Sequence, residues 1–166
     1  MIIYHGSTQI IDCPRLIESD RFLDFGKGFY TTTNLEQATR WATIKQKRTA
    51  TEAAYVNLYE IDNDLLSNKD LASLLFPEAN REWLEFVTGN RRGNPLHEYD
   101  IVKGAVANDT IYQTLVLYEA GAYTVEETVT RLKVHQLFDQ ISFHTEISLK
   151  KIIYQKSLLI DPVKQE

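Results

Sequence analysis

The spacing of apolar and polar residues divides the chain into short strands around a central block of helices. Apolar or alternating stretches predict strands at residues 1–5, 54–61, 99–106, 140–144 and 151–160. Helical spacing predicts helices over residues 35–48, 110–120 and 124–137, and a helical segment over 64–90. The strands are too irregularly spaced for a sandwich and do not alternate strictly with helices. We therefore expect an α+β fold, with a split antiparallel or mixed β-sheet core and a helical insertion around 64–90.

Several predicted helix ends carry capping residues. Asn34 precedes one helix, with Gln37 at the third position of a capping box. Thr124 and Glu127 have the same spacing before another helix, and Gly121 follows the helix over 110–120, where a glycine is favoured. These residues mark the helix ends independently of the apolar pattern.

Length and composition fit one globular domain. The chain has 166 residues, of which 43% are hydrophobic and 25% charged, and this length allows a single domain over residues 1–166. One cysteine, Cys13, excludes an intramolecular disulfide framework and a metal site built on a cysteine cluster. His97, His135 and His144 form no recognisable metal-ligand pattern with acidic pairs, so we expect no metal.

The expected cellular location and the net charge bear on two kinds of partner, membranes and nucleic acids. The N-terminal segment lacks the basic and apolar regions of a signal peptide, and no run approaches about 18 apolar residues. We therefore expect a cytoplasmic protein with no membrane partner. The net charge of −5 disfavours non-specific nucleic-acid binding, because phosphate affinity comes mainly from Lys and Arg.

The end of the first predicted strand carries candidate chemistry. Its last residues are Tyr4, His5, Gly6 and Ser7. Gly6 permits close approach of a ligand to the backbone, and the His5 ring offers a donor and an acceptor near neutral pH. A strand-ending turn with a hydrogen-bonded histidine explains the same residues without a ligand.

A glycine-containing segment and a tryptophan follow. Residues 24–33, DFGKGFYTTT, place two glycines two positions apart, with Tyr30 shortly after them. The pattern is neither GxGxxG nor GxxxxGK[ST], so it indicates a phosphate-binding loop only weakly. Ten residues separate Tyr30 from Trp41, and two rings on either side of a gap can hold a flat ring by offset stacking. A packed turn and a core tryptophan are the alternatives.

A late strand has one polar face. Alternation over residues 139–145 places Gln140, Ser142 and His144 on one side, and Ile141 and Phe143 on the other. The polar face belongs either to a sheet edge in water or to the wall of a polar site, and the strand alone does not distinguish the two.

Together these segments resemble a known family pattern. His-Gly-Ser at the end of a first strand, Phe-Gly-Lys-Gly-x-Tyr and a later aromatic residue look like the ADP-ribosyltransferase fold of the diphtheria-toxin and poly(ADP-ribose) polymerase type. A bacterial family described as a domain of unknown function is similar over about residues 2–155, in the segments YHGS, DFGKGFYTTTNLEQATRWA, EWLEFV, YDIVKGAVANDTIY and QISFHTEISLKKI. The resemblance implies a transferase with NAD as co-substrate and a small antitoxin-type protein, encoded nearby, as partner.

The resemblance also implies roles for single residues. His5 would hydrogen-bond a ribose hydroxyl of NAD, the Gly6 backbone would pair with the nicotinamide carboxamide, and Ser7 would support that pocket. Tyr30 would stack on the nicotinamide ring, and Trp41 would close its other side. The expected catalytic residues are His5, Tyr30 and Gln140. The expected NAD contacts are these three with Tyr4, Gly6, Ser7, Phe25, Gly28, Thr31 and Trp41.

Gln140 stands where transferases of this type usually carry a catalytic glutamate. Opening the nicotinamide–ribose bond builds positive charge on the ribose, as in glycoside hydrolysis, and a carboxylate stabilises that charge. A glutamine can bond a ribose hydroxyl but brings no full charge, so we do not expect polymer elongation. Strand alternation turns Asp139 away, Glu146 shares the face of Gln140 only in a longer strand, and nothing in the sequence places Glu119 there.

We therefore expect an NAD-dependent mono-ADP-ribosyltransferase, the toxin of a toxin–antitoxin system. Its acceptor is a protein, a nucleic acid or a small molecule. A catalytically weak or inactive module that binds NAD or ADP-ribose is one alternative, motivated by Gln140, and an NAD glycohydrolase is another. Arg91, Asn108 and Asp109 stand in loop-like contexts, where they either line the acceptor side or order a loop.

Overall fold

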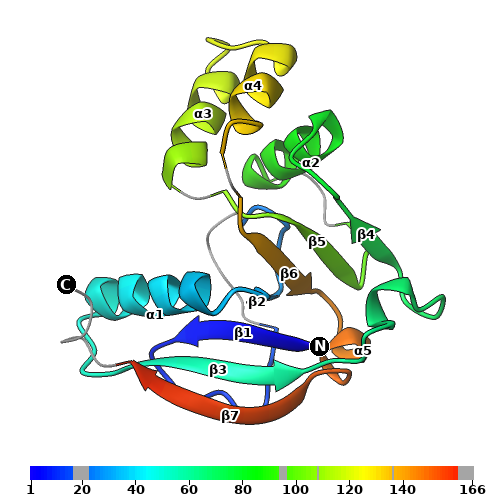
Figure 1. Cartoon of the computed structure of the whole chain (residues 1–166). Helices are drawn as coiled ribbons and strands as arrows, with labels where there is room; N and C mark the ends of the chain where they lie inside the picture. The colour runs from blue at the N-terminus through cyan, green and yellow to red at the C-terminus, as the bar shows by residue number, and fades with distance from the viewer. Residues whose placement is uncertain (17–22, 94–96, 108, 136, 161–166) are drawn as a thin grey trace.

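Two β-sheets of different size form the centre of the fold (Figure 1). The computed structural model describes residues 1–16, 23–93, 97–107, 109–135 and 137–160. The smaller sheet is antiparallel and has the strand order β1 (Ile2–Ser7), β3 (Ala54–Glu60), β7 (Ile153–Ile160). The larger sheet has the order β2 (Phe29–Thr31), β6 (Asp139–Phe143), β5 (Ile101–Ala105), β4 (Ser73–Leu75). It is mixed, because β4 runs parallel to β5 while the other neighbours are antiparallel.

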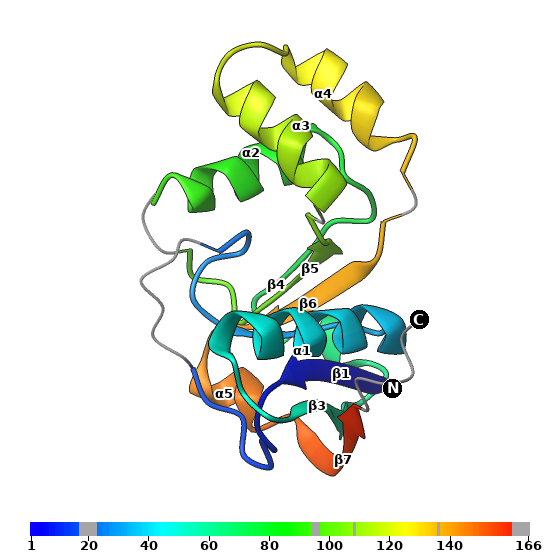
Figure 2. The same cartoon turned by 90° about the vertical axis from the view of Figure 1, so that its left-hand side faces the viewer.

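The helices divide between the two sheets. Helix α1 (Leu35–Thr49) packs on the three-stranded sheet, chiefly against β1 and β3. Figure 2 shows three further helices together on the far side of the four-stranded sheet: α2 (Arg81–Arg91), α3 (Asp109–Glu119) and α4 (Val125–Leu132). The short helix α5 (Glu146–Leu149) connects β6 to β7, and a 3-10 turn covers Leu65–Ser67.

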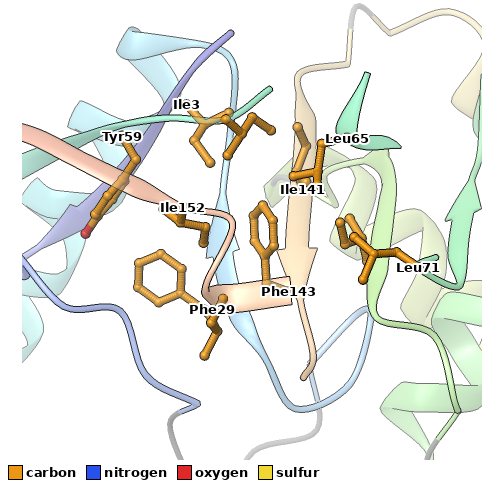
Figure 3. Packing of buried hydrophobic residues seen from close by; sticks show 11 residues of the cluster. Ile3, Phe29, Tyr59, Leu65, Leu71, Ile141, Phe143 and Ile152 are labelled. Atoms are coloured by element: carbon orange, nitrogen blue, oxygen red, sulfur yellow. The ribbon is translucent and has the colours of Figure 1, made fainter. Parts of the chain in front are cut away.

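The four-stranded sheet is covered on both faces. One apolar cluster fills the space between the sheets, where Ile3 and Tyr59 meet Phe29, Ile141 and Phe143 (Figure 3). A second cluster lies on the opposite face, beneath the three helices, and includes Phe25, Trp83, Leu84, Val102, Ile111, Leu115 and Leu132. The polar face of β6 therefore belongs to the interior, since Gln140 and Ser142 are 3% and 0% exposed.

Much of the expected architecture is confirmed. The fold is α+β with two open sheets, and the five predicted strands correspond to β1, β3, β5, β6 and β7. Asn34 caps α1 by accepting from the Gln37 amide, and Thr124 with Glu127 forms a full capping box on α4. Gly121 has φ +77, as a residue after a helix requires.

Other expectations are wrong in detail. Residues 64–90 are not continuously helical, because Ser73–Leu75 pairs with β5 and forms β4. Arg91 lies in α2 rather than in a loop, and α4 ends at Leu132 rather than near 137. The strand β2 and the helix α5 have only three and four residues, and the apolar pattern predicts neither. None of the helices in the described residues combines the length and apolar character that crossing a membrane requires.

Candidate functional site

His5 is held as a neutral ring near the end of β1. The ring stacks on Phe29 with centroids 4.5 Å apart, and Nδ1 lies 2.6 Å from the main-chain oxygen of Tyr30. Because a carbonyl oxygen can only accept, Nδ1 carries the hydrogen and Nε2 remains an acceptor. Burial lowers the pKa of His5 to about 4, and the nearby Lys45 ammonium acts in the same direction. The ring is therefore uncharged at neutral pH.

The second nitrogen of this ring has no donor. Nε2 of His5 is buried and makes no hydrogen bond within the part of the chain that the structure describes. A buried acceptor without a donor costs about 1–3 kcal/mol relative to a satisfied one. A ligand hydroxyl that reached Nε2 would remove this cost, so the site favours a partner with an O–H group.

Gly6 is buried and packs closely against α1. A Cβ at this position would lie 2.2 Å from the oxygen of Ala38 and 2.6 Å from the nitrogen of Ala42, so the glycine allows α1 to pack directly on β1. On the edge away from β3, the bridge between β1 and β2 joins Tyr4 and Thr32. The next amide and carbonyl on this edge belong to Gly6, because backbone groups alternate sides along a strand.

Tyr4 and Ser7 both make contacts with other residues of the fold. Tyr4 packs against the small apolar cluster beneath α1 with Val56 and Leu58. Ser7 is 5% exposed, and its Oγ accepts a hydrogen bond from the Gln9 amide. The structure therefore places both beside His5 and Gly6 along the strand, with contacts that belong to the fold.

Tyr30 joins β2 to the glycine segment. Its hydroxyl donates to the main-chain oxygen of Gly26 at 2.6 Å and accepts from the Phe25 amide at 3.1 Å. Gly26 has φ +83, which suits a glycine in this tight turn. Burial raises the pKa of Tyr30 far above its usual range, so the hydroxyl stays protonated. The ring itself is half-buried and lies on the face of the sheet that Ser142 and Gln140 share.

Trp41 lies beside Gly6 rather than stacked on Tyr30. A Cβ at Gly6 would be 3.1 Å from the Cβ of Trp41, and the indole is half-buried. No ring contact joins Trp41 to Tyr30 within the described residues. Within the described residues, the Tyr30 ring contacts Phe25 and His144, so the two rings of the expected clamp do not face each other.

A charged cluster that the sequence did not predict lies near Gln140. Arg91 lies 3.6 Å from Asp24 and 4.0 Å from Glu119, and its guanidinium stacks over the Tyr112 ring. The Gln140 amide nitrogen lies 3.4 Å from the oxygen of Ala105. Burial raises the pKa of Asp24, while Arg91, the Gln140 side chain and the main chain of Ala107 oppose that rise. The position of Asp24 in the sequence does not identify it as a member of this cluster, because aspartates are common at the start of turns.

Ser142 and His144 secure the glycine segment. His144 Nδ1 donates to the Lys27 oxygen at 2.7 Å, so Nε2 accepts from the Ser142 hydroxyl at 2.8 Å. Burial lowers the pKa of His144 to about 4. Ser142 is fully buried and its hydroxyl bonds His144, so this serine–histidine pair belongs to the packing of the glycine segment. A Cβ at Gly28 would lie 2.8 Å from His144 Nδ1, which shows how tightly the segment packs there.

The other residues expected to contact NAD or the acceptor have different surroundings in the structure. Phe25 is fully buried in the apolar cluster beneath α2. Thr31 is also fully buried and donates to the Ile141 oxygen on the opposite face of the sheet from Tyr30. Of the expected acceptor-side residues, Arg91 is an ordered member of the charged cluster. Asn108 lies outside the described residues, and Asp109 begins α3.

A hollow of about 670 Å³ lies elsewhere on the four-stranded sheet. Its lining includes Phe76, Lys103, Ala105, Lys133, His135 and Phe138, but none of His5, Tyr30, Trp41 and Gln140. Over the described residues, no group of three or more His, Cys, Asp or Glu side chains is arranged to hold a metal ion.

Comparison with known proteins places the chain in a family. A family model described as protein of unknown function (DUF3990) matches residues 1–154. The chain belongs to the DUF3990 family. This membership confirms the expected relation to a domain of unknown function, and the matched residues of this DUF3990 member include His5, Tyr30, Trp41 and Gln140. No curated protein and no solved structure matches the chain.

Proposed function

We propose that the chain is an NAD-dependent mono-ADP-ribosyltransferase with an ADP-ribosyltransferase-like fold. The observation that carries the proposal is the buried Nε2 of His5, an acceptor without a donor. A ribose hydroxyl of NAD is a donor of the required kind. The geometry fits the resemblance of the sequence, in which the histidine of the first strand bonds that sugar.

Neighbouring groups extend the fit to the nicotinamide. The outward amide and carbonyl of Gly6 match the carbonyl and amino group of a carboxamide. Trp41 lies beside Gly6, and Tyr30 presents a half-buried ring from β2. A planar ring bound at Gly6 would lie near Trp41, and offset stacking on an aromatic ring is worth about 0.5–1.5 kcal/mol per pair.

The chemistry requires stabilisation of a cationic sugar. NAD supplies a ribose carbon, C1′, that carries a good leaving group. The C1′–N bond breaks with its electron pair on the nicotinamide nitrogen, an acceptor N–H or O–H group forms the new bond to C1′, and its proton passes to solvent. His5 holds a ribose hydroxyl while this charge develops.

Nicotinamide release is the direct test. His5→Ala removes the acceptor at Nε2, and we expect it to reduce nicotinamide release from NAD by about 100-fold. His135→Ala is the matched control, because His135 lines the separate hollow. Absence of nicotinamide release and of labelled ADP-ribose transfer by the wild-type chain in cell extract would contradict the proposal.

Product analysis and growth separate the alternatives. Free ADP-ribose as the only product would show hydrolysis by water, and NAD binding without any product would show a binding module. The toxin role predicts growth arrest on expression, relieved by His5→Ala. A small protein encoded nearby is the partner that the resemblance implies, and its co-expression should restore growth.

A further inference from the structure

The hollow on the four-stranded sheet lies apart from the proposed NAD site. We propose that it binds a carboxylate with an apolar body, either a free carboxylic acid or the C-terminus of a peptide. Its volume of about 670 Å³ is within the range of about 300–1,000 Å³ that is typical of small-molecule sites. The proposal does not depend on the transferase function, because the lining of the hollow includes none of His5, Tyr30, Trp41 and Gln140.

The hollow lies where β5 extends past the end of β4. The strand β4 ends at Leu75, and the last backbone bond of this pair joins the Phe76 amide to the Lys103 oxygen at 2.8 Å. The strand β5 continues to Ala105, which lines the hollow together with Leu75 and Phe76. Within the described residues, the last part of β5 therefore has no strand on this side.

The amide of Ala105 points to this open side. Backbone groups alternate along a strand, and the amide of the next residue, Val106, bonds the Phe138 oxygen on the side of β6. The oxygen of Ala105 accepts from Trp83 Nε1 at 3.1 Å, but its amide hydrogen meets no acceptor among the residues that the structure describes. A ligand oxygen in the hollow would complete this bond.

Two lysines add positive charge to the hollow. Lys103 precedes Ala105 by two residues, so both side chains leave the strand on the same face. Its ammonium lies 3.7 Å from an Asp139 oxygen, which is an ion pair but is beyond hydrogen-bond distance. Lys133 is exposed just after the end of α4 and also lines the hollow. The ammonium groups can therefore donate to a bound anion.

Two carboxylates, those of Glu78 and Asp139, line the hollow as well. Asp139 accepts hydrogen bonds from the amide and the hydroxyl of Thr33, at 3.0 and 2.8 Å. Glu78 is exposed, so water screens its charge. A ligand carboxylate has two oxygens that only accept, so it matches one unpaired amide hydrogen and two ammonium groups.

Apolar side chains form most of the remaining wall. Phe76 and Leu132 are 8% and 1% exposed, whereas Leu75, Leu137 and Phe138 are more open. An apolar body bound against these side chains is removed from water, which drives binding. The amide and the lysines then select the charged end of the ligand.

An acid and its amide form a matched pair of probes. Phenylbutyrate carries the carboxylate, and phenylbutyramide has the same apolar body without the charge. We expect the wild-type chain to bind the acid with a Kd of about 1 mM or tighter, and the amide at least about 10-fold more weakly. In an NMR titration the acid should shift the signal of the Ala105 amide, because a charge-assisted hydrogen bond forms there.

Three variants test the charge of the hollow. Lys103→Gln should weaken binding of the acid about 3- to 10-fold and leave binding of the amide unchanged. Lys156→Gln is the matched control, since this exposed lysine of β7 does not line the hollow, and it should change the Kd less than about 2-fold. Leu75→Glu places a negative charge at an exposed position of the lining and should abolish binding of the acid, while the NMR spectrum checks the fold.

A peptide distinguishes the two sources of the carboxylate. If acetyl-Gly-Gly-Phe with a free C-terminus binds more tightly than phenylbutyrate, the ligand is a peptide C-terminus, and if it binds more weakly, the ligand is a free acid. Equal affinities for phenylbutyrate and its amide, an unchanged affinity in Lys103→Gln or an unshifted Ala105 amide would each overturn the proposal. Absence of binding by both acids would also overturn it. Nicotinamide release enters none of these measurements, so the proposed transferase function is tested separately.

Discussion

Two polar centres lie within the fold, one on each side of β2. They differ in how their buried polar groups are paired. The centre at His5 contains a single uncharged ring, fixed by one main-chain oxygen and a stacked Phe29. The centre at Asp24 contains two carboxyl groups, those of Asp24 and Glu119, that share the single guanidinium of Arg91. A buried neutral acceptor without a donor lowers the stability of the folded state only modestly. A buried charge without a partner destabilises it strongly.

Tyr30 links these two centres through different atoms. Its main-chain oxygen accepts from His5, and its hydroxyl bonds the two residues that follow Asp24 in the chain. The strand β2 is short, but it carries the residue that contacts both His5 and the segment next to the charged cluster. Changes on either side should therefore be separable, and the predictions below test this.

The largest expected effect comes from breaking the charged centre. Arg91→Met leaves Asp24 and Glu119 without their cation, and we expect the free energy of unfolding at pH 7 to fall by about 3–5 kcal/mol. Urea unfolding measures the change. Adding Asp24→Asn to this variant should restore part of the loss, because one unpaired charge is removed.

Arg81→Met is the control for this experiment. Arg81 pairs with Glu85 on the exposed surface of the same helix, where an ion pair contributes little. Its replacement should leave the unfolding midpoint nearly unchanged. Equal losses from Arg81→Met and Arg91→Met would show that the buried cluster has no special place in stability.

The two centres should respond to acid in opposite directions. The folded pKa of His5 is about 4 against 6.5 when unfolded, so its contribution is complete above pH 6.5 and is lost as the pH falls toward 4. This difference between the folded and unfolded pKa values of His5 corresponds to about 3 kcal/mol in the free energy of unfolding. The raised pKa of Asp24 has the opposite sign, since its proton is bound more tightly in the folded state, so acid relieves its burial.

Unfolding measured across this pH range separates the contributions. His5→Gln should flatten the dependence of unfolding free energy on pH between 4.5 and 6.5 without abolishing it, because His144 has the same sign. Asp24→Asn should steepen it, since the opposing titration is gone. Identical slopes in the wild type and in both variants would show that neither group is perturbed by burial.

Local signals explain which parts of this arrangement the sequence predicts. The caps at Asn34, Thr124 and Gly121 involve neighbours three or four residues apart, so their residue types determine the outcome. Alternation along β6 likewise separates Gln140 and Ser142 from Ile141 correctly. The His5 position follows from the end of an apolar strand, although its tautomer depends on the Tyr30 oxygen.

Long-range pairing explains what the sequence does not predict. Residues 73–75 form a strand only because β5 lies alongside, and the short apolar run is equally compatible with a helix. The polar face of β6 is buried because α2, α3 and α4 cover it, which no property of the strand specifies. The ion pairs of Arg91 with Asp24 and Glu119 depend on the same tertiary packing, so this cluster could not be located beforehand.

The smallest expected effect tests the connection that Tyr30 makes between the two centres. Tyr30→Phe removes the hydroxyl that bonds the Gly26 oxygen and the Phe25 amide, and we expect the free energy of unfolding to fall by about 1–2 kcal/mol. The contact with His5 uses the main chain, so the pKa of His5, followed by NMR, should stay near 4. A pKa of His5 that rises toward 6.5 in this variant would show that the glycine segment, and not β2 alone, holds the ring. The two centres would then form one cooperative unit, and Asp24 variants would be expected to change the pKa of His5 as well.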